Sequence, residues 1–343
     1  MTPERVKALS GFKLILLAVS AVALAAASLW FTRSSASPPG PLEAITIATN
    51  TVYAGSCSIF AAQDRGYFAQ EGLLVTVQPH TTGKAALEAT LEGKAHLGTS
   101  ADIPIMFAAT QGQPVAVIAT IFATQSDYAI MGRKDRGIST PASLRGRRIG
   151  VTLNTSGHFV LDAFLNRQKL SMSDVTVLDF KPEELAAALV KGEVDAVATW
   201  EPYLSAIREQ IHANAVMFSA NGVYDATYNL SGARDYVAAH PDTVKKVLRA
   251  LISGGHFCKE MPDLARGVAA KVMQTTPEKL EEFWPSYRFD VGLDQSLLLA
   301  LEEETRWAAK NKLAGQGPMP NYLNYIDLNG LLAVMPTAVT VIH

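Results

Sequence analysis

A tryptophan and a carboxylate stand side by side at the end of an apolar segment, in the sequence GEVDAVATWEPYL at 192–204. Trp200 offers a flat apolar ring that either fills a core or forms one wall of a ligand pocket. Glu201 either stabilises the start of the helix that Pro202 opens, or accepts a hydrogen bond from a ligand nitrogen, which contributes roughly 1.5–3 kcal/mol when charged. The pair therefore indicates either a site for an organic nitrogen compound or an acid at a helix start beside a packed ring.

A second acid, Asp102, occupies the equivalent position in a weak internal repeat. Residues 86–106 (ALEATLEGKAHLGTSADIPIM) and 184–204 (ELAAALVKGEVDAVATWEPYL) share a helical stretch, a glycine stop, a short strand and a turn that carries an acid. Two carboxylates could act as general acid and general base. Their matching places in the repeat favour two helix-start acids instead.

Two polar loops supply small residues and hydroxyl groups, each directly before a predicted helix. They are 50–56 (NTVYAGS) and 153–157 (LNTSG). Free backbone N–H groups and the helix dipole make such places favourable for an anion or a polar head group. Ser56 and Ser156 could equally do no more than cap their helices. Their matching positions in two similar segments favour a ligand site.

The remaining chemistry is sparse. The sequence contains no G-x-S-x-G, Walker, G-x-G-x-x-G or H-E-x-x-H motif, and its seven histidines are scattered. We therefore expect no catalytic set, no metal and no cofactor. With 30 basic and 32 acidic residues interspersed along the chain, no clustered basic face for nucleic acid is expected either.

Cys57 and Cys258 are the two cysteines of the sequence. Export from the cytoplasm would make a disulfide chemically possible. Two cysteines so far apart need a geometry that the sequence does not supply. Our prediction is two unpaired, buried thiols.

These residues are positioned by short apolar strands that alternate with helices, a pattern typical of an α/β fold with largely parallel sheets. Strands are predicted at 43–49, 72–78, 95–99, 114–122, 128–132, 147–152, 175–179 and 193–199, with helices at 58–67, 83–91, 102–111, 156–168 and 182–191. Ligands of open α/β sheets bind outside the carboxyl ends of the strands. The loops and acids described above should therefore line one cleft between two lobes.

The C-terminal third is predicted to be helical and to pack back on the lobes. Helices are expected at 241–253, 262–273, 277–284 and 295–312, whereas 321–343 is not assigned. A chain of 343 residues exceeds what one hydrophobic core usually organises. The predicted division is lobe I (first part) at 42–129, lobe II at 130–226, and a return to lobe I with C-terminal helices at 227–343.

The N-terminal residues 1–41 are predicted to lie outside the fold. Arg5, Lys7 and Lys13 precede an apolar run at 14–31, followed by a loose SSASPPGP segment. Positive residues before an apolar run are typical of an export signal. The run has 18 residues, which is long for a signal core and just long enough to span a bilayer. Both a cleaved signal peptide and an uncleaved membrane anchor would place the protein in the periplasm or at the cell surface.

Three motifs in order resemble those of the nitrate/sulfonate/taurine (NitT/TauT) family of ABC-transporter substrate-binding proteins, which is similar to proteins that bind a thiamine pyrimidine precursor. They are 60–77 (FAAQDRGYFAQEGLLVTV), 140–151 (TPASLRGRRIGV) and 188–203 (ALVKGEVDAVATWEPY). The resemblance extends from 42 to about 251. It implies a type II periplasmic-binding-protein fold, in which two α/β lobes close on one small molecule and present it to an ABC permease and ATPase. A monomer is expected.

By matching positions, the resemblance implies a set of ligand-binding residues in the cleft loops. They are Tyr53, Gly55, Ser56, Ser100, Ala101, Gln125, Asn154, Thr155, Ser156, Trp200, Glu201 and Tyr224.

The resemblance implies a choice among nitrate, bicarbonate, sulfonates, taurine and a pyrimidine precursor. A bare oxyanion would be repelled by the carboxylate of Glu201, whereas an amine or aminopyrimidine could pair with it. We therefore expect an organic ligand with a nitrogen donor, taurine-like or thiamine-pyrimidine-like, over nitrate or bicarbonate. An enzyme of the same fold, a pyrimidine synthase or a dehydratase, is the alternative. Synthase-type relatives carry a cysteine-rich cluster, whereas this chain has two cysteines and an export segment.

Overall fold

Two five-stranded sheets form the framework of the computed structural model, which describes residues 41–315 and 317–342. The predicted signal peptide or anchor at 1–41 lies almost wholly outside the described residues. Within them, no helix is long and apolar enough to cross a bilayer. Both sheets belong to one compact unit, Glu43–His343.

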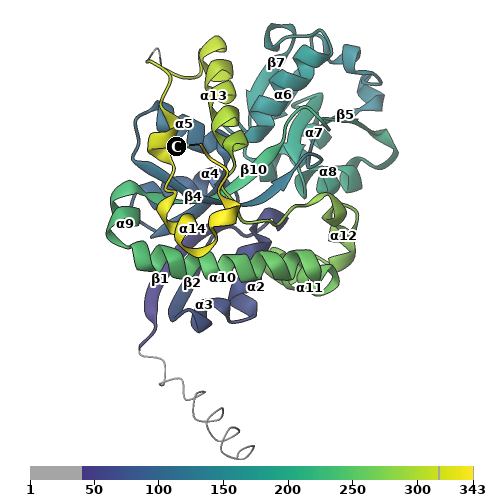
Figure 1. Cartoon of the computed structure of the whole chain (residues 1–343). Helices are drawn as coiled ribbons and strands as arrows, with labels where there is room; N and C mark the ends of the chain where they lie inside the picture. The colour runs from purple at the N-terminus through teal and green to yellow at the C-terminus, as the bar shows by residue number, and fades with distance from the viewer. Residues whose placement is uncertain (1–40, 316, 343) are drawn as a thin grey trace, which may run out of the picture. The chain divides into compact units, whose positions relative to one another are not determined.

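The sheet of lobe I has the strand order β2-β1-β3-β10-β4 (Figure 1). Its first three strands are parallel, and the late strand β10 pairs antiparallel with both β3 and β4. The strands are β1 (Glu43–Asn50), β2 (Leu73–His80), β3 (Leu97–Ala101), β4 (Val115–Thr124) and β10 (Ala226–Ala233). The helices that accompany the first four strands are α2 (Cys57–Asp64), α3 (Tyr67–Gln70), α4 (Gly83–Leu91) and α5 (Asp102–Thr110).

The sheet of lobe II repeats this arrangement with the order β7-β6-β8-β5-β9. β6 is parallel to β7 and β8, whereas β5 is antiparallel to β8 and β9. The strands are β5 (Tyr128–Arg133), β6 (Arg148–Val151), β7 (Thr176–Asp179), β8 (Ala196–Trp200) and β9 (Ala215–Ser219), and the helices are α6 (Ser156–Arg167), α7 (Leu185–Lys191) and α8 (Tyr203–Ile211). The predicted internal repeat is confirmed, because β3 and β8 hold equivalent middle places in their sheets.

The two lobes are joined by short segments at 125–127 and 220–225, where β4 leads into β5 and β9 into β10. These segments lie close to the predicted division of the chain. The prediction of largely parallel sheets holds for four strands of each sheet. The fifth strand, β10 in lobe I and β5 in lobe II, is antiparallel to both of its neighbours, and it is the strand on which the chain enters that lobe from the other one.

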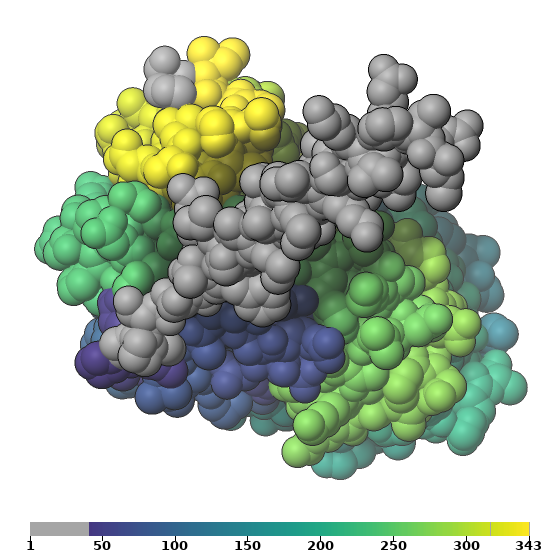
Figure 2. Space-filling model, turned by 60° about the horizontal axis from the view of Figure 1, so that its bottom comes forward, coloured from purple at the N-terminus to yellow at the C-terminus, as the bar shows by residue number. Residues whose placement is uncertain are grey.

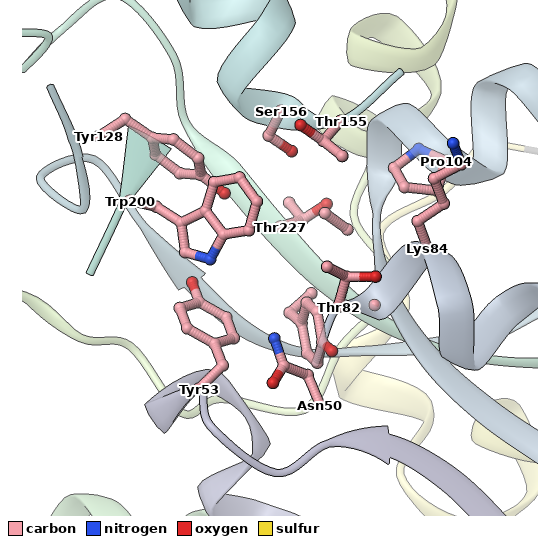
Figure 3. A pocket seen from close by; sticks show the side chains of 13 residues that line it. Asn50, Tyr53, Thr82, Lys84, Pro104, Tyr128, Thr155, Ser156, Trp200 and Thr227 are labelled. Carbon is pink, nitrogen blue, oxygen red and sulfur yellow. The ribbon is translucent and has the colours of Figure 1, made fainter. Parts of the chain in front are cut away.

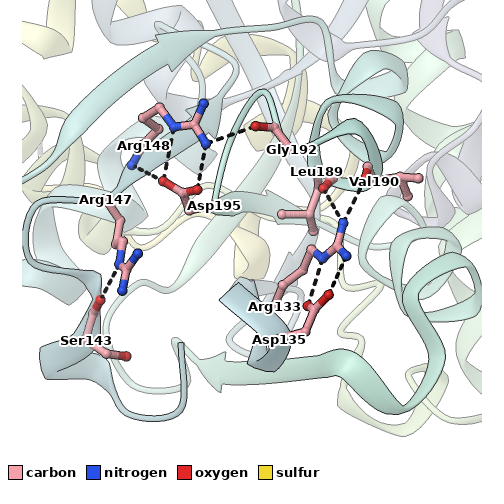
Figure 4. A network of polar contacts seen from close by, with 9 residues as sticks. All are labelled: Arg133, Asp135, Ser143, Arg147, Arg148, Leu189, Val190, Gly192 and Asp195. Atoms are coloured by element: carbon pink, nitrogen blue, oxygen red, sulfur yellow. Dashed lines mark hydrogen bonds and ion pairs between the residues drawn. The ribbon is translucent and has the colours of Figure 1, made fainter. Parts of the chain in front are cut away.

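The helix ends follow from local chemistry. Gly93 and Gly192, predicted as helix stops, adopt left-handed φ angles of 75° and 77°, which glycine reaches without steric cost. The carbonyl groups that end α7 are bound by two arginines (Figure 4). Arg133 Nη1 donates to the carbonyls of residues 189 and 190, and Arg148 Nη2 donates to that of Gly192 at 2.9 Å. Asp195 orients Arg148 through a 2.7 Å ion pair, which gives Gly192 and Asp195 a structural role in lobe II.

The returning chain covers lobe I with helices. They are α9 (Arg234–Ala239), α10 (Pro241–Glu260), α11 (Pro262–Met273), α12 (Pro277–Glu281), α13 (Gln295–Lys310) and α14 (Asn329–Val334). Short 3-10 helices are η1 (Ala54–Ser56), η2 (Lys134–Arg136), η3 (Pro141–Leu144), η4 (Met172–Asp174), η5 (Pro182–Glu184), η6 (His212–Asn214), η7 (Trp284–Ser286), η8 (Tyr322–Tyr325) and η9 (Pro336–Ala338). The first part of lobe I, in blue-purple, and parts of the returning chain, in green, lie on one face of the molecule although they are far apart in sequence (Figure 2).

The prediction of two unpaired thiols is wrong, since Cys57 and Cys258 form a disulfide between α2 and α10. Helix α10 returns to pack directly on α2, and this brings two residues 201 positions apart to a Cα–Cα distance of 6.3 Å. A glycine permits the close approach, because a Cβ at Gly254 would lie 2.3 Å from the carbonyl oxygen of Ser58 in α2. No local sequence pattern reveals such a long-range contact.

Candidate functional site

A small cavity lies between the lobes, beside the carboxyl ends of β1, β3 and β8 (Figure 3). Its volume is about 30 Å³, which is space for about two water molecules. An organic ligand would therefore enter only if the lobes moved apart. The lining residues are Asn50, Tyr53, Thr82, Gly83, Lys84, Ala101, Pro104, Tyr128, Thr155, Ser156, Trp200, Thr227 and Tyr228.

Two helices begin at this cavity, one from each lobe. α4 begins at Gly83 and α6 begins at Ser156, and both residues line the cavity. Within the described residues, the backbone N–H groups of Gly83, Lys84, Ser156 and Gly157 bind no acceptor. Such groups, together with the positive end of the helix dipole, favour an anion. The N-termini of α4 and α6, which come from opposite lobes, could therefore hold one anionic group between the lobes.

Lys84 is the one formally charged residue among those that line the cavity. In the part of the chain that the structure describes, its ammonium group has no ion-pair partner. It extends from the first turn of α4 beside Pro104 (Figure 3). The electrostatic character of the cavity is therefore positive, and it is suited to a carboxylate, sulfonate or phosphate more than to a free amine.

Aromatic rings form much of the remaining wall. The ring centroids of Tyr53 and Tyr228 lie 5.2 Å apart, and those of Tyr128 and Trp200 lie 6.2 Å apart. Trp200 is 7% exposed and belongs to the main hydrophobic core. Both interpretations of this tryptophan therefore apply, because one ring fills the core and also faces the cavity. These faces can pack against the carbon skeleton of a ligand.

A chain of hydrogen bonds behind the cavity connects the lobes. Ser156 Oγ lies 3.1 Å from the Tyr224 hydroxyl, which in turn donates to the carboxylate of Asp102. Thr227 Oγ1 also donates to Asp102, at 3.0 Å. Burial raises the pKa of Asp102 to about 6, although these hydrogen bonds act in the opposite direction. Asp102 lies outside the cavity lining and accepts from the N–H of Ile103, in keeping with a helix-start acid.

Glu201 does not line this cavity. Its Oε2 accepts a hydrogen bond from the backbone N–H of Ser205 at 3.1 Å, in the first turn of α8. Burial raises the pKa of Glu201 above its ordinary value, opposed by the bonds from Ser205. Its side chain faces a neighbouring cavity, whereas Trp200 faces the first one. The expected pairing of Glu201 with a ligand nitrogen therefore has no geometric support at the cavity that Trp200 lines.

The predicted binding residues divide into two sets in the structure. Those that line the cavity are Tyr53, Ala101, Thr155, Ser156 and Trp200. Those outside its lining are Gly55, Ser56, Ser100, Gln125, Asn154, Glu201 and Tyr224. Ser56, for example, is fully buried and bonds to Thr49 and to the carbonyl of Asn50, so its hydroxyl is occupied within lobe I.

Several lining residues were missed from the sequence, among them Thr82, Gly83 and Lys84 at the start of α4. The signal was available there, because a threonine followed by glycine precedes a predicted helix, as in the two loops that were selected. Thr227 and Tyr228 lie on β10, which was not predicted at all. Among the described residues, no group of three or more histidine, cysteine or acidic side chains could hold a metal ion.

Comparison with known proteins gives a consistent family match. The family described as NMT1/THI5 like matches residues 54–265. The "Putative aliphatic sulfonates-binding protein" of Escherichia coli is 31% identical over 191 residues, 56% of this chain and 60% of that protein. The "Taurine-binding periplasmic protein" of the same species is 24% identical over 208 residues, 60% of this chain and 63% of that protein.

An enzyme is also among the relatives. The 4-amino-5-hydroxymethyl-2-methylpyrimidine phosphate synthase of Schizosaccharomyces pombe is 27% identical over 208 residues, 57% of this chain and 59% of that protein. Among solved structures, the alkanesulfonate-binding protein SsuA from Xanthomonas axonopodis pv. citri, bound to MOPS, has a TM-score of 0.73 at 21% identity, over 84% of this chain and 99% of that one. This likeness establishes the periplasmic-binding-protein fold.

Proposed function

The chain belongs to the NMT1/THI5-like family, and from this membership we propose that it is the extracytoplasmic solute-binding component of an ABC importer. In this role the two lobes close on a small organic anion and deliver it to a permease and its ATPase. The curated relatives include sulfonate- and taurine-binding proteins, which agrees with a solute-binding role. An exported protein, free or held by its N-terminal segment, would meet its ligand outside the cytoplasm.

One observation carries the proposal for the ligand. The interlobe cavity combines the N-termini of α4 and α6 with the unpaired ammonium of Lys84, and no acidic side chain lines it. An anionic head group with three oxygens can accept several of these donors at once. A sulfonate with a short carbon skeleton fits this pattern, because its apolar part can lie on Trp200.

The expected nitrogen donor is a separate part of the proposal. It relied on Glu201, which faces away from this cavity. Taurine and ethanesulfonate differ by one amino group, and so they form a matched pair of ligands for this question. If taurine binds more tightly than ethanesulfonate, a group in the site recognises the ligand nitrogen. If the two bind equally, the nitrogen donor is refuted and the proposed anion site is unaffected.

Isothermal titration calorimetry of the purified protein tests the proposal. We expect ethanesulfonate and taurine to bind more tightly than nitrate, and we expect ethanol, which lacks the anionic group, not to bind. Tighter binding of nitrate than of either sulfonate would refute the proposal of an organic anion. Chemical conversion of a bound ligand during prolonged incubation would instead favour an enzyme of the same fold, the alternative that the synthase relative represents.

A further inference from the structure

A second and larger cavity lies beside the first, with a volume of about 370 Å³. This is within the range of about 300–1,000 Å³ that is usual for small-molecule sites. Its walls come from lobe I, from α8 of lobe II, and from α11 and α12 of the returning chain. The lining residues are Val52, Ala54, Thr81, Glu183, Glu201, Pro202, Tyr203, Ser205, Ala206, Glu209, Met273, Gln274, Thr275, Lys279, Leu280, Phe283 and Tyr287.

The two cavities are separate. They share no lining residue. Tyr203 stands between them, because its hydroxyl donates to the carbonyl of Thr81 across the lobes at 3.2 Å and its ring packs edge-on against Trp200 at 5.7 Å. The second cavity therefore adjoins the first but is lined by different side chains.

Its charge is opposite to that of the first cavity. Three carboxylates line it, Glu183, Glu201 and Glu209, against one ammonium, that of Lys279. Lys279 forms an ion pair with Glu209 at 2.7 Å, and both side chains are exposed. Glu183 and Glu201 have no ion-pair partner within residues 41–315 and 317–342. The lining therefore carries more negative than positive charge, although the charge of Arg208 in α8 acts to lower the pKa of Glu201.

Glu201 is the central group of this wall. It is 6% exposed, and its Oε2 is occupied by the N–H of Ser205. In the described part of the chain, the other hydrogen bond that lowers the pKa of this acid comes from the side chain of the same Ser205. Arg208 lies in the same helix, but its guanidinium bonds to Ser205 Oγ and to Glu282 instead. A carboxylate that is more than nine-tenths buried and has no ion-pair partner is costly, and a cationic donor would lower this cost.

A second buried acid stands behind Glu201. The backbone N–H of Glu201 donates to the carbonyl of Asp127 at 3.1 Å, and the charge of Glu201 contributes to raising the pKa of Asp127, after burial. Asp127 Oδ1 is itself buried without a partner. Because this buried acid cannot neutralise Glu201, a positive charge in the cavity would offset the charge of Glu201.

We infer that the second cavity binds a small organic cation, an amine with an apolar body whose N–H group donates to the carboxylate of Glu201. The rings of Tyr203, Phe283 and Tyr287 supply apolar contact and the negative ring faces that attract a cation. This site is distinct from the proposed anion site, and it explains why an acid follows Trp200 in the sequence.

Benzylamine and benzyl alcohol are suitable probes, because they share an aromatic body and differ in the charged group. Calorimetry should show saturable binding of benzylamine to the wild-type protein and at least tenfold weaker binding of benzyl alcohol. Glu201→Gln should weaken benzylamine binding at least tenfold, whereas Glu193→Gln, at an exposed carboxylate of lobe II that pairs with Lys191, should leave it unchanged. Absence of saturable benzylamine binding, or equal affinities of wild type and Glu201→Gln, would overturn the inference.

A second variant fills the cavity without touching the acid. Ala206 is an exposed residue of α8 that lines the cavity, and Ala206→Phe should abolish benzylamine binding while the protein stays folded. Wild-type affinity in this variant would also overturn the inference. Titration of each variant with ethanesulfonate tests the proposed function separately. Failure of ethanesulfonate to bind would refute the anion site in the first cavity and would leave the cation site in the second cavity to be judged by benzylamine binding.

Discussion

Replacing Asp127 by asparagine should change how the stability of the protein depends on pH. Asp127 is 0% exposed, and the Tyr53 hydroxyl donates to its Oδ2 at 2.9 Å. Burial raises its pKa from an ordinary 3.8 to about 7, although Tyr287 and Tyr53 both act to lower it. Because desolvation dominates, the folded protein favours the protonated form of this acid.

The magnitude follows from these two pKa values. The folded state binds the proton more tightly than the unfolded state, so the contribution of Asp127 to stability is complete below pH 3.8 and is lost as the pH rises toward 7. Between pH 5 and pH 8 the loss amounts to about 3 kcal/mol. Asparagine does not titrate, and its side-chain oxygen can still accept from Tyr53. Asp127→Asn should therefore lack this loss.

Urea unfolding at pH 5 and pH 8 measures the effect. The free energy of unfolding of the wild type should fall by about 3 kcal/mol more than that of Asp127→Asn over this interval. Asp263→Asn, at an exposed acid of α11, is the matched control and should follow the wild type. Parallel pH dependences for all three proteins would refute the account of a buried, protonated Asp127.

Two further predictions concern stability. Reduction of the Cys57–Cys258 disulfide, which joins residues 201 positions apart, should lower the free energy of unfolding by about 2–5 kcal/mol; an unchanged unfolding midpoint in reductant would mean that α10 holds α2 without it. Trp200→Ala should cost about 3–5 kcal/mol, because the ring is packed in the core, and should weaken ethanesulfonate binding. Urea unfolding measures the stability of Trp200→Ala, and calorimetry measures its affinity for ethanesulfonate. If Trp200→Ala is as stable as the wild type, the ring is only a pocket wall.

Much of the local structure could be predicted because its signals are local. α11 has the predicted bounds 262–273, since a proline begins it and its apolar residues keep helical spacing. The repeat also predicted that Asp102 and Glu201 follow equivalent strands. β10 was missed although its sequence ATYNLSGA alternates apolar and polar residues over 226–231, and its pairing could not be predicted because its partners β3 and β4 are distant in sequence.

The site was predicted only in part, and the reason is the direction of side chains. Trp200 and Glu201 are adjacent, so the sequence suggested that both contact one ligand. In the structure they face different cavities, because neighbouring residues at a strand end point to opposite sides. Lys84 shows the reverse case. No motif of the sequence singled it out, yet the fold brings it to the interlobe cavity.

The most direct test of the central claim is the affinity of ethanesulfonate for Lys84→Gln, measured by calorimetry beside Lys94→Gln. Lys94 is an exposed lysine that pairs with Glu92, and so it controls for the loss of one positive charge. If Lys84 and the two helix N-termini hold the anionic group, Lys84→Gln should weaken binding by about tenfold or more, since a charged hydrogen bond contributes roughly 1.5–3 kcal/mol. Lys94→Gln should bind as the wild type does. Equal affinities in all three proteins would contradict the account of an anion held between the lobes.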